Sequence, residues 1–181
     1  MTDGTARPVK VPSTDKCLRI LSENGCEEAV VEHCRAVAQL SVRIAKRCGA
    51  DQELVEAGAL LHDIGRCRTH GVDHAVEGAK IASSLKLPQA LVKVIERHIG
   101  GGISKAEAKR LGLPEKDYTP RTLEEMVVAH ADNLLSGTKR TPVGQVVSQL
   151  IRKGMDEPAA RVLRLHKALS EACRCDVDTI P

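Results

Sequence analysis

Ala59-Leu60-Leu61-His62-Asp63-Ile64-Gly65-Arg66 is an apolar run that ends in two adjacent side chains able to bind a metal ion. An α-helix advances by about 100° per residue, so His62 and Asp63 can both turn toward one cavity if the helix ends beside them. Gly65 is the residue expected to end that helix. The doublet therefore predicts half of a metal site at a helix end.

Further metal-binding side chains lie at dispersed positions, each on or beside a segment with helical periodicity. They are His33, His74, His98 and Asp132. Imidazole nitrogens and carboxylate oxygens are ligands that Fe, Mn, Ni and Zn ions accept, and a bridging carboxylate can hold two such ions close together. Six ligands of these types would serve two metal ions.

The hydrophobic pattern predicts an all-α fold, a helical bundle of about eight or nine helices. Expected capping residues are Ser13 or Thr14, Asp51, Ser104 and Thr122, and Thr122 with Glu125 resembles a capping box. No segment shows the strict alternation typical of a strand. The expected helices cover residues 13–24, 27–48, 52–63, 74–85, 88–98, 104–111, 122–136, 142–153 and 156–173.

The composition indicates one globular unit with an aliphatic core. The chain has 181 residues, is 42% hydrophobic, and contains one Tyr, no Phe and no Trp. A core of this kind must be built from Leu, Ile, Val and Ala, which closely packed helices can use. We expect residues 1–12 to form a flexible arm and residues 13–181 to form a single domain.

Charge, cysteine content and the apolar stretches of the chain indicate which partners and which compartment to expect. The 27 basic and 24 acidic residues are mixed along the chain, which argues against a stable nucleic-acid partner and leaves nucleic acid only as a substrate. Seven cysteines without a repeated CxxC spacing indicate reduced thiols, and Cys173-Arg174-Cys175 is only a weak metal-binding pattern. With no signal sequence or apolar stretch of about 20 residues, we expect a soluble cytoplasmic protein without a membrane partner.

The pattern of His33, the His62-Asp63 doublet and Asp132 followed by Asn133 resembles the HD superfamily of metal-dependent phosphohydrolases. The doublet stands in the HDIG form found in small members. The resemblance covers about residues 27–136 and leaves the helices of 142–175 outside. It implies an HD-domain bundle in which His33, His62, Asp63 and Asp132 bind one divalent transition metal ion. His74 and His98 look like the two extra histidines of members with a binuclear centre, where Asp63 would bridge two Fe, Mn, Ni or Zn ions.

The resemblance implies hydrolysis of a nucleotide or a related small phosphoester, with Asp63 helping to activate a water molecule. Arg66 lies one turn beyond Asp63, where its guanidinium would clamp a phosphoryl group, the alternative being a solvated arginine. His70 would contact substrate phosphate and protonate the leaving group, or else face solvent. The catalytic candidates are therefore Asp63, Arg66 and His70.

Two other functions fit the same ligand set. HD-type diiron oxygenases use six similar ligands, and a catalytically inactive nucleotide-binding regulator would keep the fold without turnover. Arg66 beside the doublet favours hydrolysis, and the complete ligand set argues against an inactive regulator. Of the remaining histidines, His130 lies some 200° around the helix from Asp132 and is expected to be a buried supporting residue, whereas His166 is expected at the surface.

Overall fold

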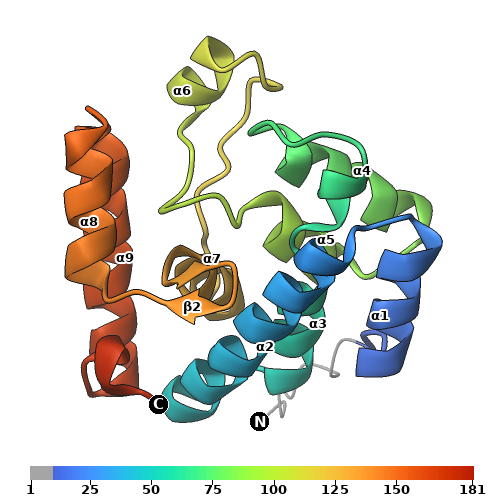
Figure 1. The fold of residues 1–181 in the computed structure, drawn as a ribbon, viewed down its shortest axis with the longest axis horizontal. Coiled ribbons are helices and arrows are strands. Elements are labelled where there is room, and N and C mark those ends of the chain that lie inside the picture. The colour runs from blue at the N-terminus through green and yellow to red at the C-terminus, as the bar shows by residue number, and fades with distance from the viewer. Residues whose placement is uncertain (1–9) are drawn as a thin grey trace, which may run out of the picture.

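The computed structural model describes residues 10–181 and confirms the all-α prediction, with nine α-helices in this part of the chain (Figure 1). The α-helices are α1 (Thr14–Glu23), α2 (Glu28–Cys48), α3 (Gln52–Leu61), α4 (His74–Ser84), α5 (Gln89–Glu96), α6 (Lys105–Arg110), α7 (Leu123–Asn133), α8 (Val143–Arg152) and α9 (Asp156–Cys173). The short elements are the 3₁₀-helices η1 (Ile64–Cys67) and η2 (Val177–Thr179) and the strands β1 (Leu135–Ser136) and β2 (Lys139–Arg140). Residues 1–9 of the expected arm lie outside the described residues.

The antiparallel hairpin of β1 and β2 departs from the prediction of no strands. Each strand is two residues long, which is too short to show an alternating pattern in the sequence. The hairpin also shortens the expected helix over 122–136, because α7 ends at Asn133. Among residues 10–181, no helix has both the length and the apolar character that a membrane span needs.

Four predicted caps are confirmed, and they fix where four of the helices begin. The side chains of Ser13, Asp51, Ser104 and Thr122 accept hydrogen bonds from backbone N–H groups in the first turns of α1, α3, α6 and α7. The second half of the predicted capping box differs, since the Glu125 carboxylate accepts from the backbone N–H of Arg121 instead of that of Thr122. Local capping thus sets helix starts, but tertiary contacts decide which partner Glu125 takes.

The buried core is aliphatic, as the composition predicts, and one cluster of side chains extends from α1 to η2. In Figure 1, α8 and α9 stand on one flank and α1 on the other, with α2, α3 and α7 between them. Val37, Ile44 and Leu61 are fully buried in this region, while Tyr118 belongs to a separate small cluster near α6. The doublet at the end of α3 therefore projects from the middle of the bundle.

Gly65 is required for close packing and not for ending a helix. Helix α3 already ends at Leu61, and the φ angle of Gly65 is not in the left-handed region. A Cβ atom at Gly65 would lie 1.9 Å from the carbonyl oxygen of His74 and 2.6 Å from the backbone nitrogen of Gly78. Glycine therefore lets η1, which follows the doublet, lie directly on the backbone of α4.

We predict that Gly65→Ala lowers the free energy of unfolding by at least about 2 kcal/mol, because the backbones of η1 and α4 must separate to admit a methyl group. Urea unfolding followed by circular dichroism measures this loss. The matched control is Gly144→Ala in α8, where a Cβ meets no atom within 4 Å, and there we expect no loss or a gain of up to about 1 kcal/mol from helix propensity. Equal effects at both positions would contradict this explanation of Gly65.

Candidate metal centre

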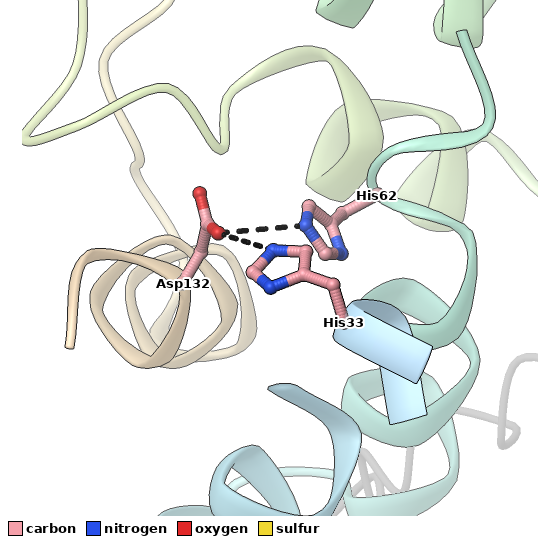
Figure 2. A group of neighbouring side chains, drawn as sticks. All are labelled: His33, His62 and Asp132. Atoms are coloured by element: carbon pink, nitrogen blue, oxygen red, sulfur yellow. Dashed lines mark hydrogen bonds and ion pairs between the residues drawn. The ribbon is translucent and has the colours of Figure 1, made fainter. Parts of the chain in front are cut away.

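Three side chains from different helices meet at the end of α3. His33 comes from the second turn of α2, His62 follows the last residue of α3, and Asp132 comes from the last turn of α7. The Oδ1 atom of Asp132 lies 3.0 Å from Nε2 of His33 and 3.6 Å from Nε2 of His62 (Figure 2). These residues, nearly 100 positions apart in the chain, form the first of two donor groups.

The second donor group lies on the other side of Asp63. Nε2 of His74, at the start of α4, is 3.0 Å from Oδ1 of Asp63, and Nε2 of His98, just after α5, is 3.6 Å from the same oxygen. The other carboxylate oxygen, Oδ2, lies 3.9 Å from Nε2 of His33 and 3.7 Å from Nε2 of His62. Asp63 therefore turns one oxygen toward each donor group.

All four histidines are oriented by a hydrogen bond from Nδ1 to a backbone carbonyl. Because a carbonyl only accepts, Nδ1 must carry the proton, and in a neutral ring Nε2 then presents its lone pair to the centre. Three of the carbonyls are local, three residues before the histidine, whereas the fourth comes from the hairpin. The Nδ1 to oxygen distances are 2.7 Å for His62 and Ala59, 2.7 Å for His74 and Gly71, 2.7 Å for His98 and Ile95, and 2.8 Å for His33 and Gly137.

This arrangement of donors fits divalent cations. Nε2 of His74 and Nε2 of His98 are 3.0 Å apart although both are acceptors in the neutral rings, so a proton or a cation must lie beside them. Nε2 of His62 and Oδ1 of Asp63 are buried without a hydrogen-bond partner. Buried polar atoms are costly when unpaired, and imidazole with carboxylate is a common donor set for transition metals.

The two carboxylates are held in the ionised form. Burial raises the pKa of Asp63, but the neighbouring His62, His74 and His98 outweigh it and bring the pKa well below its ordinary value. Burial also opposes ionisation of Asp132. When no cation is bound, a protonated His33 ring that donates from Nε2 to Asp132 leads the effects that lower the pKa of this carboxyl. Both groups therefore present negative charge to the centre at neutral pH.

Arg66 and His70 line a cavity of about 310 Å³ that opens beside the centre, together with His74 and Asp132. Arg66 donates its Nε–H to Oδ2 of Asp63 over 2.7 Å, and about a third of its side chain is exposed. The structure thus places both additional catalytic candidates next to the six donor residues. The cavity gives a ligand access to the side of the centre where Arg66 carries a positive charge.

The two remaining histidines form a buried pair on the far side of α7. His130 is fully buried, as predicted, but the prediction of a surface position for His166 is wrong, because His166 is only 8% exposed. Its Nδ1 lies 3.0 Å from Nε2 of His130, and its Nε2 lies 3.2 Å from a carboxylate oxygen of Asp176. The polar side chains that neighbour His166 on α9 predicted an exposed position. The packing of α9 on α7 buries His166 instead.

Two contacts that support the centre were not predicted from the sequence. Arg97 and Glu125 form a buried ion pair of 2.9 Å, which ties the residue before His98 to α7. Asn133 donates its side-chain N–H to the carbonyl of Gly100, which fixes the loop after His98. The contact of Asn133 could have been sought, because Asn133 follows Asp132 in the motif. The pairing of Arg97 with Glu125 depends on packing between distant segments and has no such signal.

An all-α bundle with histidine and aspartate donors gathered from α2, α3, α4, α5 and α7 defines a helical protein with a candidate site for divalent metal ions. A family model described as HD domain matches residues 30–137, a span that includes the six donors. The chain belongs to the HD domain family.

Relatives in archaea extend the similarity beyond that span. The chain is 49% identical over 163 residues to an uncharacterized protein of Methanocaldococcus jannaschii, covering 86% of this chain and 96% of that protein. It is 45% identical over 170 residues to a protein of Thermoplasma volcanium named tRNA (cytidine(56)-2'-O)-methyltransferase, covering 94% of this chain. The match covers 50% of that methyltransferase, so this chain spans only half of its length.

Among solved structures, the HD domain of the phosphodiesterase PgpH of L. monocytogenes, in complex with cyclic-di-AMP, has a similar fold. The TM-score is 0.54 at 16% identity, and the match covers 86% of this chain and 95% of that one. At this identity the likeness establishes the fold alone, and it agrees with the helical architecture described above.

We predict that Mn²⁺ added to chelator-treated protein raises the Tm by roughly 5–10 °C at 100 times its Kd, because only the folded chain gathers the donors. Differential scanning fluorimetry measures the shift. In His98→Ala the shift on adding Mn²⁺ should fall by at least half, whereas the control His70→Gln, altered in the cavity and outside both donor groups, should keep it. A full shift in His98→Ala would count against the second donor group.

Proposed function

We propose that this chain is a metal-dependent phosphohydrolase that acts on a nucleotide or a related phosphoester. The observation that carries the proposal is the position of Asp63, whose two oxygens face separate donor groups. A carboxylate in this position is the feature expected of a bridge between two ions. The adjoining cavity with Arg66 supports an anionic substrate.

In this proposal His33, His62, Asp63 and Asp132 hold one ion, and Asp63, His74 and His98 hold the other. The ions, when bound, would supply an acidified water and neutralise charge on the phosphoryl oxygens. The protein supplies rings fixed by carbonyl hydrogen bonds, so the donor lone pairs already face the centre before a metal arrives. Such preorganisation lowers the cost of assembling the site.

Arg66 and His70 have distinct roles in the proposed reaction. Arg66 is fixed through Nε to Asp63, so its charge is held beside the place where a phosphoryl group would sit. A guanidinium remains protonated and is suited to orient the oxygens of the substrate rather than to give up a proton. His70 lines the same cavity and is the residue we assign to protonate the leaving oxygen.

Nucleotide phosphodiesters, including those of RNA, are the substrate class that the comparisons favour. One relative is named for an enzyme acting on tRNA, and the solved structure with a similar fold is named for a phosphodiesterase with a cyclic dinucleotide. We assign hydrolysis, not methyl transfer, to this chain, since its donor set suits metal-assisted hydrolysis and it spans half of that methyltransferase. RNA would then be a substrate and not a stable partner, which agrees with the basic and acidic residues being mixed along the chain.

We predict that Asp63→Asn lowers phosphoester hydrolysis by more than about a hundredfold, because the substituted amide can no longer bridge two ions with full negative charge. The assay is phosphate or nucleotide release from a panel of nucleoside monophosphates, a cyclic dinucleotide and a short RNA, with Mn²⁺ present. Asp15→Asn is the matched control, an exposed carboxylate on α1. Full activity in Asp63→Asn would overturn the proposed chemistry.

The same assay separates the competing functions. Turnover without dioxygen excludes an obligatory oxygenase, whereas tight binding of a panel member with no product would indicate an inactive regulator. A labelled methyl donor with tRNA tests methyl transfer directly. If product forms only in this methyl-transfer assay, the chain has the activity for which the Thermoplasma relative is named.

A separate prediction concerns Arg66. Arg66→Ala should lower kcat/KM by roughly 100-fold and Arg66→Lys by roughly tenfold, because lysine keeps the charge but loses the planar contact with Asp63. Steady-state kinetics with the best panel substrate measures both values. Arg68→Ala is the control, since Arg68 is a more exposed neighbour that pairs with Glu77; similar losses in both alanine variants would contradict a specific role for Arg66.

A further inference from the structure

Three of the seven free cysteines gather where the ends of α2 and α9 meet, about four turns along α2 from His33. Cys48 is the last residue of α2, Cys173 is the last residue of α9, and Cys175 follows two residues later. Cys173 is buried, while the other two are partly exposed. The proposed function uses none of them, so their proximity needs its own explanation.

The sulfur atoms of Cys48 and Cys173 lie against the same turn of α2. The Sγ of Cys173 is 4.0 Å from the carbonyl oxygen of Ile44, and the Sγ of Cys48 is 3.8 Å from that of the next residue, Ala45. Side chains of a helix lean toward its N-terminus, which places the Cys48 thiol over this turn. The two thiols, from helices far apart in sequence, therefore lie over the same turn, and Cys48 is within hydrogen-bonding reach of Cys173.

The same end of the molecule is open and positively charged. A cavity of about 540 Å³ is lined by Arg43, Lys46, Arg47 and Cys175. These cations lie on the last turns of α2, next to Cys48. A small anionic molecule is attracted to such a rim, which brings an anionic disulfide reagent to Cys175 and to the end of α2 that carries Cys48.

We propose that Cys48 and Cys173 are a disulfide-forming pair that joins the ends of α2 and α9 by exchange with a small anionic disulfide. In the first exchange the Cys48 sulfur, after losing its proton, displaces one thiolate from the reagent. In the second, Cys173 loses its proton and displaces the other thiolate from Cys48. Two protein thiols are oxidised to one disulfide, and the reagent is reduced to two thiols, which take up the protons.

The protonation of Cys173 explains this order. Burial, and after it the neighbouring Cys48 thiol, raises the pKa of Cys173 to about 12. Cys173 is therefore protonated at neutral pH and a poor first nucleophile, because the thiolate is the reactive form. Cys48 is half-buried at the helix end and therefore meets the reagent before the buried Cys173. The second exchange is intramolecular, which compensates for the poor nucleophile.

A bond at this position would restrict the unfolded chain strongly. It closes a loop of roughly 125 residues, and longer loops lose more conformational entropy on cross-linking. The helices it joins already pack together in one core, so the cross-link demands little rearrangement. Its expected effect is therefore on stability, and its test does not depend on the proposed catalytic function.

The experiment treats the folded full chain with oxidised glutathione at pH 8, blocks the remaining thiols, digests without reduction and maps cross-linked peptides by mass spectrometry. We expect a peptide pair joined through Cys48 and Cys173. The Tm of the cross-linked protein should exceed that of the reduced protein by roughly 10 °C. Cys48→Ser should abolish both the cross-link and the Tm increase, while its reduced form should unfold like the reduced parent chain.

The chain offers a second thiol pair as an internal control. The Sγ of Cys26 lies 3.7 Å from the carbonyl oxygen of Ile64, and its neighbour Cys67 is the last residue of η1. Cys26→Ser should keep the cross-link between Cys48 and Cys173 and the full Tm increase. A cross-link found instead between Cys26 and Cys67, a stable glutathione adduct on Cys48, or an unchanged Tm in the cross-linked protein would each overturn the proposal.

Discussion

A buried carboxylate surrounded by imidazole rings is the constraint on which the centre depends. Asp63 is almost wholly buried, and an isolated charge in such a place is unfavourable unless it is paired. Arg66 supplies part of that pairing, and a proton or cation held between the carboxylate and the histidines of both donor groups supplies the rest. The bundle must therefore bring α2, α3, α4 and α5 to one point, since each contributes or flanks a partner of this carboxylate. Helix α7 adds Asp132, which contacts His33 and His62.

Most of the ring orientation is local, which explains how much of the site could be predicted from the sequence. His62, His74 and His98 each bond to the carbonyl three residues earlier, so the local chain alone supplies the partner. His33 is different, because its carbonyl partner is Gly137, on a hairpin with no strand signal. The motif named residues that the structure brings together, but the partner that orients His33 depends on the fold.

The errors of prediction share one physical cause, contact between segments far apart in the chain. Gly65 was expected to end a helix, whereas its role is set by the backbone of α4. His166 was expected at the surface, and packing of α9 against α7 buries it beside His130. Helix starts, by contrast, were predicted well at Ser13, Asp51, Ser104 and Thr122, because capping is decided within a few residues.

The segment beyond the family match completes the core behind the centre. The HD match ends at residue 137, yet α9 contributes Val162 and Leu169 to the same buried cluster as α2 and α7. The guanidinium of Arg140 bonds to the carbonyls of Val177 and Asp178, which ties the hairpin to η2. That hairpin carries the carbonyl that orients His33. The last helices therefore hold the hairpin that aims one donor, so they belong to the structural support of the site although they lie outside its motif.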